Sequence, residues 1–305
     1  MTTRPEADAS AEAAKSATSA LPCSAPSITE SSTSAPPITT LHVDALHIDA
    51  DIIVFNKPAG LLSVPGRGPD KQDCLSARAQ QNWPEALVVH RLDMATSGLV
   101  VMARNLAAQR ALSRNFAERK IYKRYIAVVH GQLHLPHFLQ LANLQDPQKP
   151  QALAELQLNL QQPPQPRAGS NQVDQATAAG SANFGKPVDA ANWAEINLPI
   201  AVDWPRRPLR KIDALLGKAS ITRWQPLAHD LQTNTTRLAL EPITGRTHQL
   251  RLHLQALGHA ILGDMLYADA QVQARSPRLL LHACELAFAH PINSTILRFD
   301  CPAPF

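Results

Sequence analysis

Two periodicities of apolar positions alternate along residues 41–305. Runs rich in β-branched residues, such as Ile52-Ile53-Val54-Phe55, are typical of strands, and apolar positions three and four apart are typical of helices. Most strand-like runs follow one another without a helix between them, which predicts an α+β fold with a largely antiparallel sheet. The expected helices are 73–82, 106–119 and 246–257, and the expected strands are 52–55, 98–103, 120–129, 219–226, 235–241, 279–288 and 295–300.

Two regions lack both periodicities. Residues 1–40 are dominated by Ala, Ser, Thr and Pro, and residues 133–191 are rich in Gln and Pro and then in Gly, Ser, Asn and Ala. Such sequence buries too little apolar area to offset its ordering entropy. We therefore expect a disordered tail at 1–40 and one domain at 41–305, interrupted by a low-complexity insertion at about 133–191.

Charge adds one indication about partners. The chain carries a formal charge of +4, but residues 1–40 hold two basic and four acidic side chains, so the remainder carries +6. A basic surface favours a polyanionic partner, although many basic proteins bind no nucleic acid. The four cysteines form no CxxC pair, and no apolar run approaches the length of a membrane span. These features favour a cytoplasmic protein without a membrane segment.

The densest polar cluster is the segment Val89–Gly98, which lies between two apolar runs. In an extended segment Arg91 and Asp93 point to one side, while Leu92 points into the packing. An acid and a base would then share a cleft with the neighbouring His90. The alternative, a surface ion pair beside a turn, is favoured by spacing alone.

A second cluster, Glu241–His253, leads from a strand through a Pro/Gly turn into a helix. Thr244 is placed to cap that helix. Leu250, Leu254 and Leu257 form a buried stripe, which leaves Thr247, His248 and Arg251 on an adjoining face. The alternative is a solvated helix face whose charges have no function.

The third cluster, Arg119–Val129, interleaves Lys and Arg with Tyr122 and Tyr125. Base stacking with phosphate contact requires this pattern, but an edge strand protected by charge shows it too. No phosphate-binding loop, dinucleotide fingerprint or nucleophile elbow occurs, and the histidine spacings suit no metal site. We expect no metal and no cofactor.

Taken together, His90-Arg91-Leu92-Asp93, Thr96-Ser97-Gly98, Tyr125 and Gly245-Arg246-Thr247-His248-Gln249-Leu250-Arg251 resemble the RluA family of pseudouridine synthases. The resemblance covers nearly all of 41–132 and 194–305. It implies a mixed, mainly antiparallel sheet in two lobes, with flanking helices and an RNA cleft between the lobes. It also implies a cofactor-independent isomerisation of uridine to pseudouridine.

The same resemblance implies roles for four residues. Asp93 corresponds to the catalytic aspartate, Tyr125 to the tyrosine that packs on the base, and Arg251 to the arginine that ion-pairs with the aspartate. Arg91 corresponds to an arginine that fills the gap left by the flipped nucleotide. We therefore expect Asp93 to be buried at the floor of a cleft.

The resemblance further implies RNA as the partner, with a uridine in a 23S rRNA hairpin loop, one in a tRNA anticodon stem-loop, or both, as targets. We expect a monomer. Three alternatives remain at this point: a family member with a different rRNA target, a catalytically silent RNA-binding protein, and a glycoside hydrolase with Glu241 as second carboxylate. Further residues expected to contact RNA are His90, Lys57, Arg246, His248, Arg206, Arg207 and Arg210.

Overall fold

The computed structural model describes residues 43–135 and 193–305. The predicted tail and most of the predicted insertion lie outside these residues. The described residues belong to one compact unit. Its helices are η1 (Pro69–Lys71), α1 (Leu75–Asn82), α2 (Leu106–Ala117), α5 (Gln249–Ala256) and α6 (Ala270–Ala274). Its strands are β1 (Asp44–Ile48), β2 (Ile52–Lys57), β3 (Leu87–Val88), β4 (Ser97–Ala103), β5 (Tyr122–His130), β6 (Ala194–Asn197), β7 (Ile200–Val202), β8 (Arg210–Ile212), β9 (Ile221–Asp230), β10 (Thr235–Pro242), β11 (Leu281–Ala289) and β12 (Ile296–Asp300).

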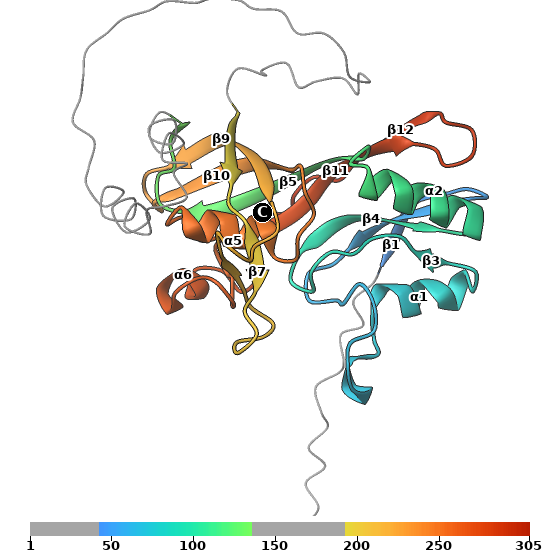
Figure 1. Ribbon diagram of the computed structural model, residues 1–305, viewed down its shortest axis with the longest axis horizontal. Coiled ribbons are helices and arrows are strands. Elements are labelled where there is room, and N and C mark those ends of the chain that lie inside the picture. The colour runs from blue at the N-terminus through green and yellow to red at the C-terminus, as the bar shows by residue number, and fades with distance from the viewer. Residues whose placement is uncertain (1–42, 136–192) are drawn as a thin grey trace, which may run out of the picture. The chain divides into compact units, whose positions relative to one another are not determined.

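Ten of these strands form one sheet, whose path runs β1-β2-β4-β11-β5-β10-β9-β6 (Figure 1). Strand β12 pairs with β11, β3 pairs with β4, and β7 and β8 form a separate two-stranded sheet. Among the described strands, β4 and β11 are the one parallel pair. The predicted mixed, mainly antiparallel α+β fold is therefore confirmed.

Strand β4 is buried along its whole length because a helix covers each face of the sheet around it. Leu99 and Val101 pack with Leu112 of α2, whereas Val100 and Met102 pack with Leu75 of α1. Alternate residues of a strand point to opposite faces, so a strand covered on both sides is apolar at every position.

A third core lies on the other half of the sheet, over β5, β9 and β10, where α5 covers it. Leu250, Leu254 and Leu257 are buried there, so the predicted apolar stripe is confirmed. The fully buried Trp224 of β9 belongs to the same core. No helix of the described residues is long and apolar enough to cross a membrane.

Two differences from the prediction concern the start of the insertion and the start of α5. Leu133 is 3% exposed and its N–H donates to Thr236 Oγ1 at 2.9 Å, so residues 133–135 belong with the folded core and not with the insertion. Helix α5 begins at Gln249, after the N-cap residue His248, and Thr244 does not cap it. The Thr244 hydroxyl instead donates to Gln249 Oε1 and accepts from the Ile221 N–H, which joins the turn to β9.

Candidate active site

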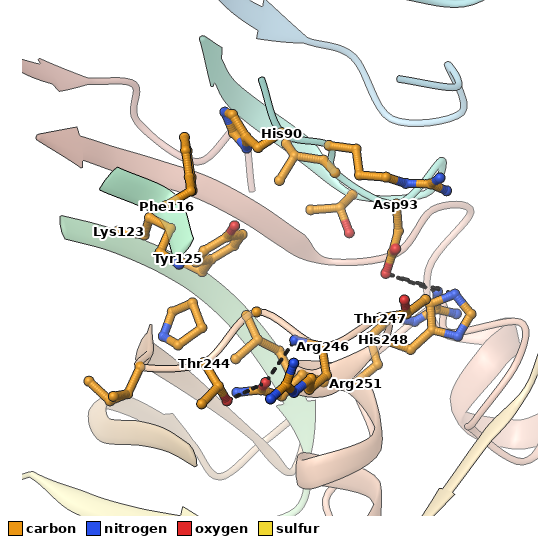
Figure 2. Close-up of a pocket in the computed structure, with 18 of the residues that line it drawn as sticks. His90, Asp93, Phe116, Lys123, Tyr125, Thr244, Arg246, Thr247, His248 and Arg251 are labelled. Atoms are coloured by element: carbon orange, nitrogen blue, oxygen red, sulfur yellow. Dashed lines mark hydrogen bonds and ion pairs between the residues drawn. The ribbon is translucent and has the colours of Figure 1, made fainter. Parts of the chain in front are cut away.

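The three polar clusters of the sequence meet in one pocket of about 550 Å³ (Figure 2). The loop between β3 and β4 forms one wall, the end of α2 and the start of β5 another, and the turn before α5 the third. The lining residues are His90–Asp93, Thr96, Phe116, Ala117, Arg119, Lys123, Tyr125, Pro242–Arg251 and Leu281.

Asp93 is held in this pocket by the loop around it. Leu92 is buried, and both its N–H and its carbonyl bond to the hydroxyl of Ser63, at 3.1 and 2.7 Å. Arg91 is exposed and lines the same pocket, as expected for an extended segment. The Asp93 side chain is 22% exposed, so the expectation of full burial is wrong. The pocket is open, and the carboxylate lies within reach of a bound ligand.

Arg251 faces Asp93 but is bound more closely by another acid. Its Nη1 lies 3.9 Å from Asp93 Oδ2, whereas its Nε and Nη2 donate to the Asp264 carboxylate at 2.8 and 2.5 Å. Burial opposes the charge of this guanidinium, but the bonds to Asp264 outweigh that effect and raise the pKa of Arg251. Arg251 therefore stays cationic and fixed beside Asp93.

Asp264 was not among the site residues that the sequence predicted. Its side chain is 1% exposed, and its Oδ1 also accepts the N–H groups of Leu266 and Tyr267. The apolar pair Ile261-Leu262 before Gly263-Asp264 indicates only that a turn here starts from the protein interior. Nothing in the local sequence indicated that this carboxylate meets Arg251.

His248 and Tyr267 form a second link to Asp93. The Arg210 N–H donates to Tyr267 Oη at 2.9 Å, and Tyr267 Oη lies 2.8 Å from His248 Nδ1. Because the Tyr267 hydroxyl accepts from Arg210, its own proton is free to be donated to His248 Nδ1. The ring proton of His248 then lies on Nε2, the nitrogen that is 3.9 Å from Asp93 Oδ2. His248 holds this place with a φ of 59°, a left-handed backbone that costs a histidine energy.

Burial is the main influence on the pKa of His248 and lowers it, although the Asp93 charge acts in the opposite direction. The ring is therefore mainly neutral at neutral pH, as the tautomer above requires. Tyr125 lies across the pocket from it, on β5 (Figure 2). Burial and the nearby Asp93 raise the pKa of Tyr125, so its phenol is protonated.

Lys57, which was expected to contact RNA, serves the protein interior instead. Lys57 is fully buried, and its Nζ donates to the carbonyls of Pro58, Leu61 and Met94 at 2.9, 2.7 and 3.1 Å. Burial lowers the pKa of Lys57 to about 7. This ammonium cannot reach a phosphate, so that expectation is wrong. The three hydrogen bonds of Lys57 connect the turn after β2 to the Asp93 loop.

His90 lines the pocket but is not a cation. Its Nε2 accepts the N–H of Val101 at 3.1 Å, and its ring stacks on Phe116 with centroids 4.3 Å apart. Burial lowers the pKa of His90 to about 3. The ring can offer an RNA base an apolar edge but no charge, and the expected contact of His90 with RNA stays a prediction.

Three of the cations expected to contact RNA, Arg206, Arg210 and Arg246, line an adjoining pocket of about 850 Å³. This pocket shares Gly245, Arg246 and Thr247 with the first. Arg206 pairs with Asp203, and the Arg207 guanidinium lies 4.5 Å from the Trp204 ring centroid. Trp204 is 66% exposed. The described lining of this pocket also includes Arg210, Lys211 and Lys218.

Glu241 does not line the Asp93 pocket. It is 6% exposed and accepts from Tyr122 Oη, Arg124 and Arg223 at 2.8, 3.3 and 3.2 Å. A carboxylate held by three donors outside the pocket cannot act as the second acid of a glycoside hydrolase. The described residues contain one group of metal-ligand type, Asp49, Asp51 and His290, and it lies outside the pocket.

The fold and the pocket thus define an α+β enzyme in which an aspartate, an arginine and a tyrosine from distant segments face one cationic cleft. The RNA pseudouridylate synthase family matches residues 51–256. The chain belongs to this family, and its reaction is the isomerisation of uridine in RNA.

Named relatives agree with the family match. The dual-specificity RNA pseudouridine synthase RluA of Pasteurella multocida (strain Pm70) is 39% identical over 269 residues, which are 88% of this chain and 97% of that protein. RluA of Escherichia coli (strain K12) is 38% identical over 260 residues, 85% of this chain and 93% of that protein. The predicted similarity to the RluA enzymes is confirmed.

A solved structure has the same fold. Human RNA Pseudouridylate Synthase Domain Containing 1 superimposes with a TM-score of 0.59 at 24% identity, over 89% of this chain and 87% of that one. At 24% identity this similarity supports the fold and nothing further.

Proposed function

We propose that the protein isomerises uridines in RNA loops with Asp93 as the catalytic carboxylate. The observation that carries the proposal is the convergence of Asp93, Tyr125 and Arg251 in one pocket from three separate segments. The reaction breaks the bond between uracil N1 and C1′, turns the base, and joins C5 to C1′. One carboxylate near C1′ serves this chemistry, either by adding to the sugar or by removing a proton to form a glycal.

In this proposal Arg251 supplies a fixed positive charge beside Asp93, and Tyr125 stacks on the extruded uracil. Stacking on an aromatic ring contributes roughly 1–3 kcal/mol per base, which offsets the few kcal/mol of unstacking. Arg91 is exposed at the pocket rim and is placed to fill the space that the uridine leaves. Loop uridines are the favoured targets because they cost less to extrude than paired ones.

We further propose that the adjoining cationic pocket binds the phosphates next to the target uridine. Arg206, Arg210 and Arg246 line it, and Arg246 borders both pockets. The RluA relatives are named as dual-specificity enzymes. Accordingly, the substrates proposed for this chain are a 23S rRNA hairpin-loop uridine and a tRNA anticodon stem-loop uridine.

We also propose that the enzyme works as a cytoplasmic monomer without metal or cofactor. Cys74, Cys284 and Cys301 are free and buried, which suits a reducing compartment. The Asp93 chemistry needs no redox agent.

The test replaces Asp93 by Asn, with the exposed Asp300→Asn as matched control. Transcribed tRNA and 23S hairpin substrates are incubated with each variant, and carbodiimide labelling of the product detects the isomerisation. Asp93→Asn should bind RNA and unfold at the wild-type temperature but form no pseudouridine. Turnover by Asp93→Asn would refute the role of Asp93. RNA binding without turnover by the wild type would instead identify a catalytically silent RNA-binding protein.

A further inference from the structure

The turn between β8 and β9 exposes two adjacent leucines. Leu215 is 93% exposed and Leu216 is 80% exposed. A single exposed leucine is ordinary, but a pair at the tip of one turn presents a continuous apolar surface to solvent. Neither residue belongs to any of the three cores.

The turn that carries these leucines is tightly held. The Asp213 side chain accepts the N–H groups of Leu215 and Leu216 at 3.1 and 2.9 Å, and the Gly217 N–H donates to the Asp213 carbonyl at 2.9 Å. A Cβ at Gly217 would lie 2.3 Å from that carbonyl, so glycine is required there. Both leucines are therefore presented outward by a fixed backbone.

Backbone hydrogen bonds connect the first residue of the turn to Pro199, just before β7, and the residue after the turn to Ile200 of β7. Asp213 N–H donates to the Pro199 carbonyl at 3.0 Å, and Lys218 and Ile200 exchange two backbone bonds of 2.9 and 3.0 Å. The turn thus continues the small β7–β8 sheet. A partner that binds its tip meets a preorganised surface and orders little chain on binding.

Positive charge lies beside Leu216. Leu216 lines the 850 Å³ pocket together with Arg206, Arg210, Lys211, Lys218 and Arg246. The two acids in that lining, Asp203 and Asp213, are already paired with Arg206 and Lys211 at 2.6 and 2.8 Å. A second copy of this chain would bring like charges together, whereas a polyanion would be attracted.

We propose that Leu215 and Leu216 form an apolar wedge that packs against unstacked bases of the substrate RNA, beside the strand that carries the target uridine. This inference rests on the proposed function, because the occupant is the RNA that the Asp93 pocket acts on. Apolar side chains insert most readily between bases whose unstacking costs little free energy, and the bases of an RNA loop meet this condition. The wedge would therefore recognise loops over duplexes, while the surrounding cations bind phosphate in either.

The experiment compares the full-length wild type with the double variant Leu215→Ser/Leu216→Ser. The matched control is Leu231→Ser, because Leu231 is also 80% exposed on a turn but lines neither pocket. The probes are a transcribed tRNA anticodon stem-loop and a fully paired RNA of equal length. Dissociation constants are measured by fluorescence anisotropy at several KCl concentrations, and thermal unfolding confirms that each variant folds.

We expect the double variant to bind the stem-loop about tenfold more weakly, with Leu231→Ser within about twofold of wild type. The slope of log Kd against log salt should not change, because no phosphate contact is lost. Lys218→Met should instead reduce that slope by about 0.7–0.9. Leu215→Met/Leu216→Met should restore affinity, and the duplex should bind all leucine variants equally.

Equal stem-loop affinity of the double variant and Leu231→Ser would overturn the wedge. So would an equal loss of affinity for the duplex, or a dimer in sedimentation that only the double variant abolishes. Failure of the wild type to isomerise either proposed substrate would count against the proposed function and not against the wedge, which is judged on binding.

Discussion

Replacing Asp264 by Asn should destabilise the protein far more than an equivalent change at the surface. The side chains of Arg251 and Asp264 are 4% and 1% exposed, and two hydrogen bonds join them. The asparagine side chain would keep an acceptor for the Leu266 and Tyr267 N–H groups but would leave a buried guanidinium without its main counter-charge. Breaking a buried pair in this way costs about 3–5 kcal/mol.

A surface pair of the same geometry provides the control. Arg78 Nε and Nη2 both lie 2.6 Å from the Asp73 carboxylate, but the Asp73 side chain is 60% exposed. Water replaces the lost partner there, so Asp73→Asn should cost less than about 1 kcal/mol. Urea titration at neutral pH gives both free energies of unfolding.

The double variant Arg251→Met/Asp264→Asn separates stability from catalysis. Removing the stranded guanidinium should recover part of the free energy of unfolding lost in Asp264→Asn. The double variant should be inactive, because Asp93 has lost its cation. The reasoning is refuted if the double variant is less stable than Asp264→Asn, or if Asp264→Asn costs no more than Asp73→Asn.

Three other results are expected. Tyr267→Phe removes the hydroxyl that orients His248, so kcat should fall up to about tenfold with KM little changed, whereas a purely structural role would lower the unfolding temperature instead. Burial lowers the pKa of His253 to about 4, so between pH 6.5 and 4 the unfolded state binds a proton at this group that the folded state does not. Urea titrations should therefore show the free energy of unfolding falling less steeply with falling pH in His253→Gln than in the wild type, by up to about 1.4 kcal/mol per pH unit. Lys57→Met should weaken folding by about 1–3 kcal/mol and leave the salt slope of RNA binding unchanged, because this ammonium bonds three carbonyls and no phosphate.

Local sequence determined the elements and which of their faces are buried. The uninterrupted apolar run of β4 predicted a strand, and the spacing of Leu250, Leu254 and Leu257 predicted the buried face of α5. The alternation in Arg91-Leu92-Asp93 likewise predicted which side chains enter the pocket. These features depend on residues a few positions apart, where the period of a strand or helix decides the outcome.

Partners far apart along the chain were decided only by the tertiary structure. The Lys57 side chain looked like a surface cation, yet it is enclosed because the Asp93 loop and the turn after β2 close over it. The sequence left Glu241 available for catalysis, but in the structure three donors from β5 and β9 bond to its carboxylate. Burial of a charged group depends on what the sheet places around it, and no local pattern encodes that.

The setting of Asp93 shows the same division. The sequence placed a carboxylate in a polar loop, and the family resemblance paired it with Arg251. The structure added Asp264 as the acid that fixes Arg251 and Tyr267 as the hydroxyl that orients His248. Strand β4 meets β11 across 185 residues, at the bond between Ser97 and His282. Such contacts form because whole faces pack together, so the residues that hold the aspartate in place become visible only once the chain has folded.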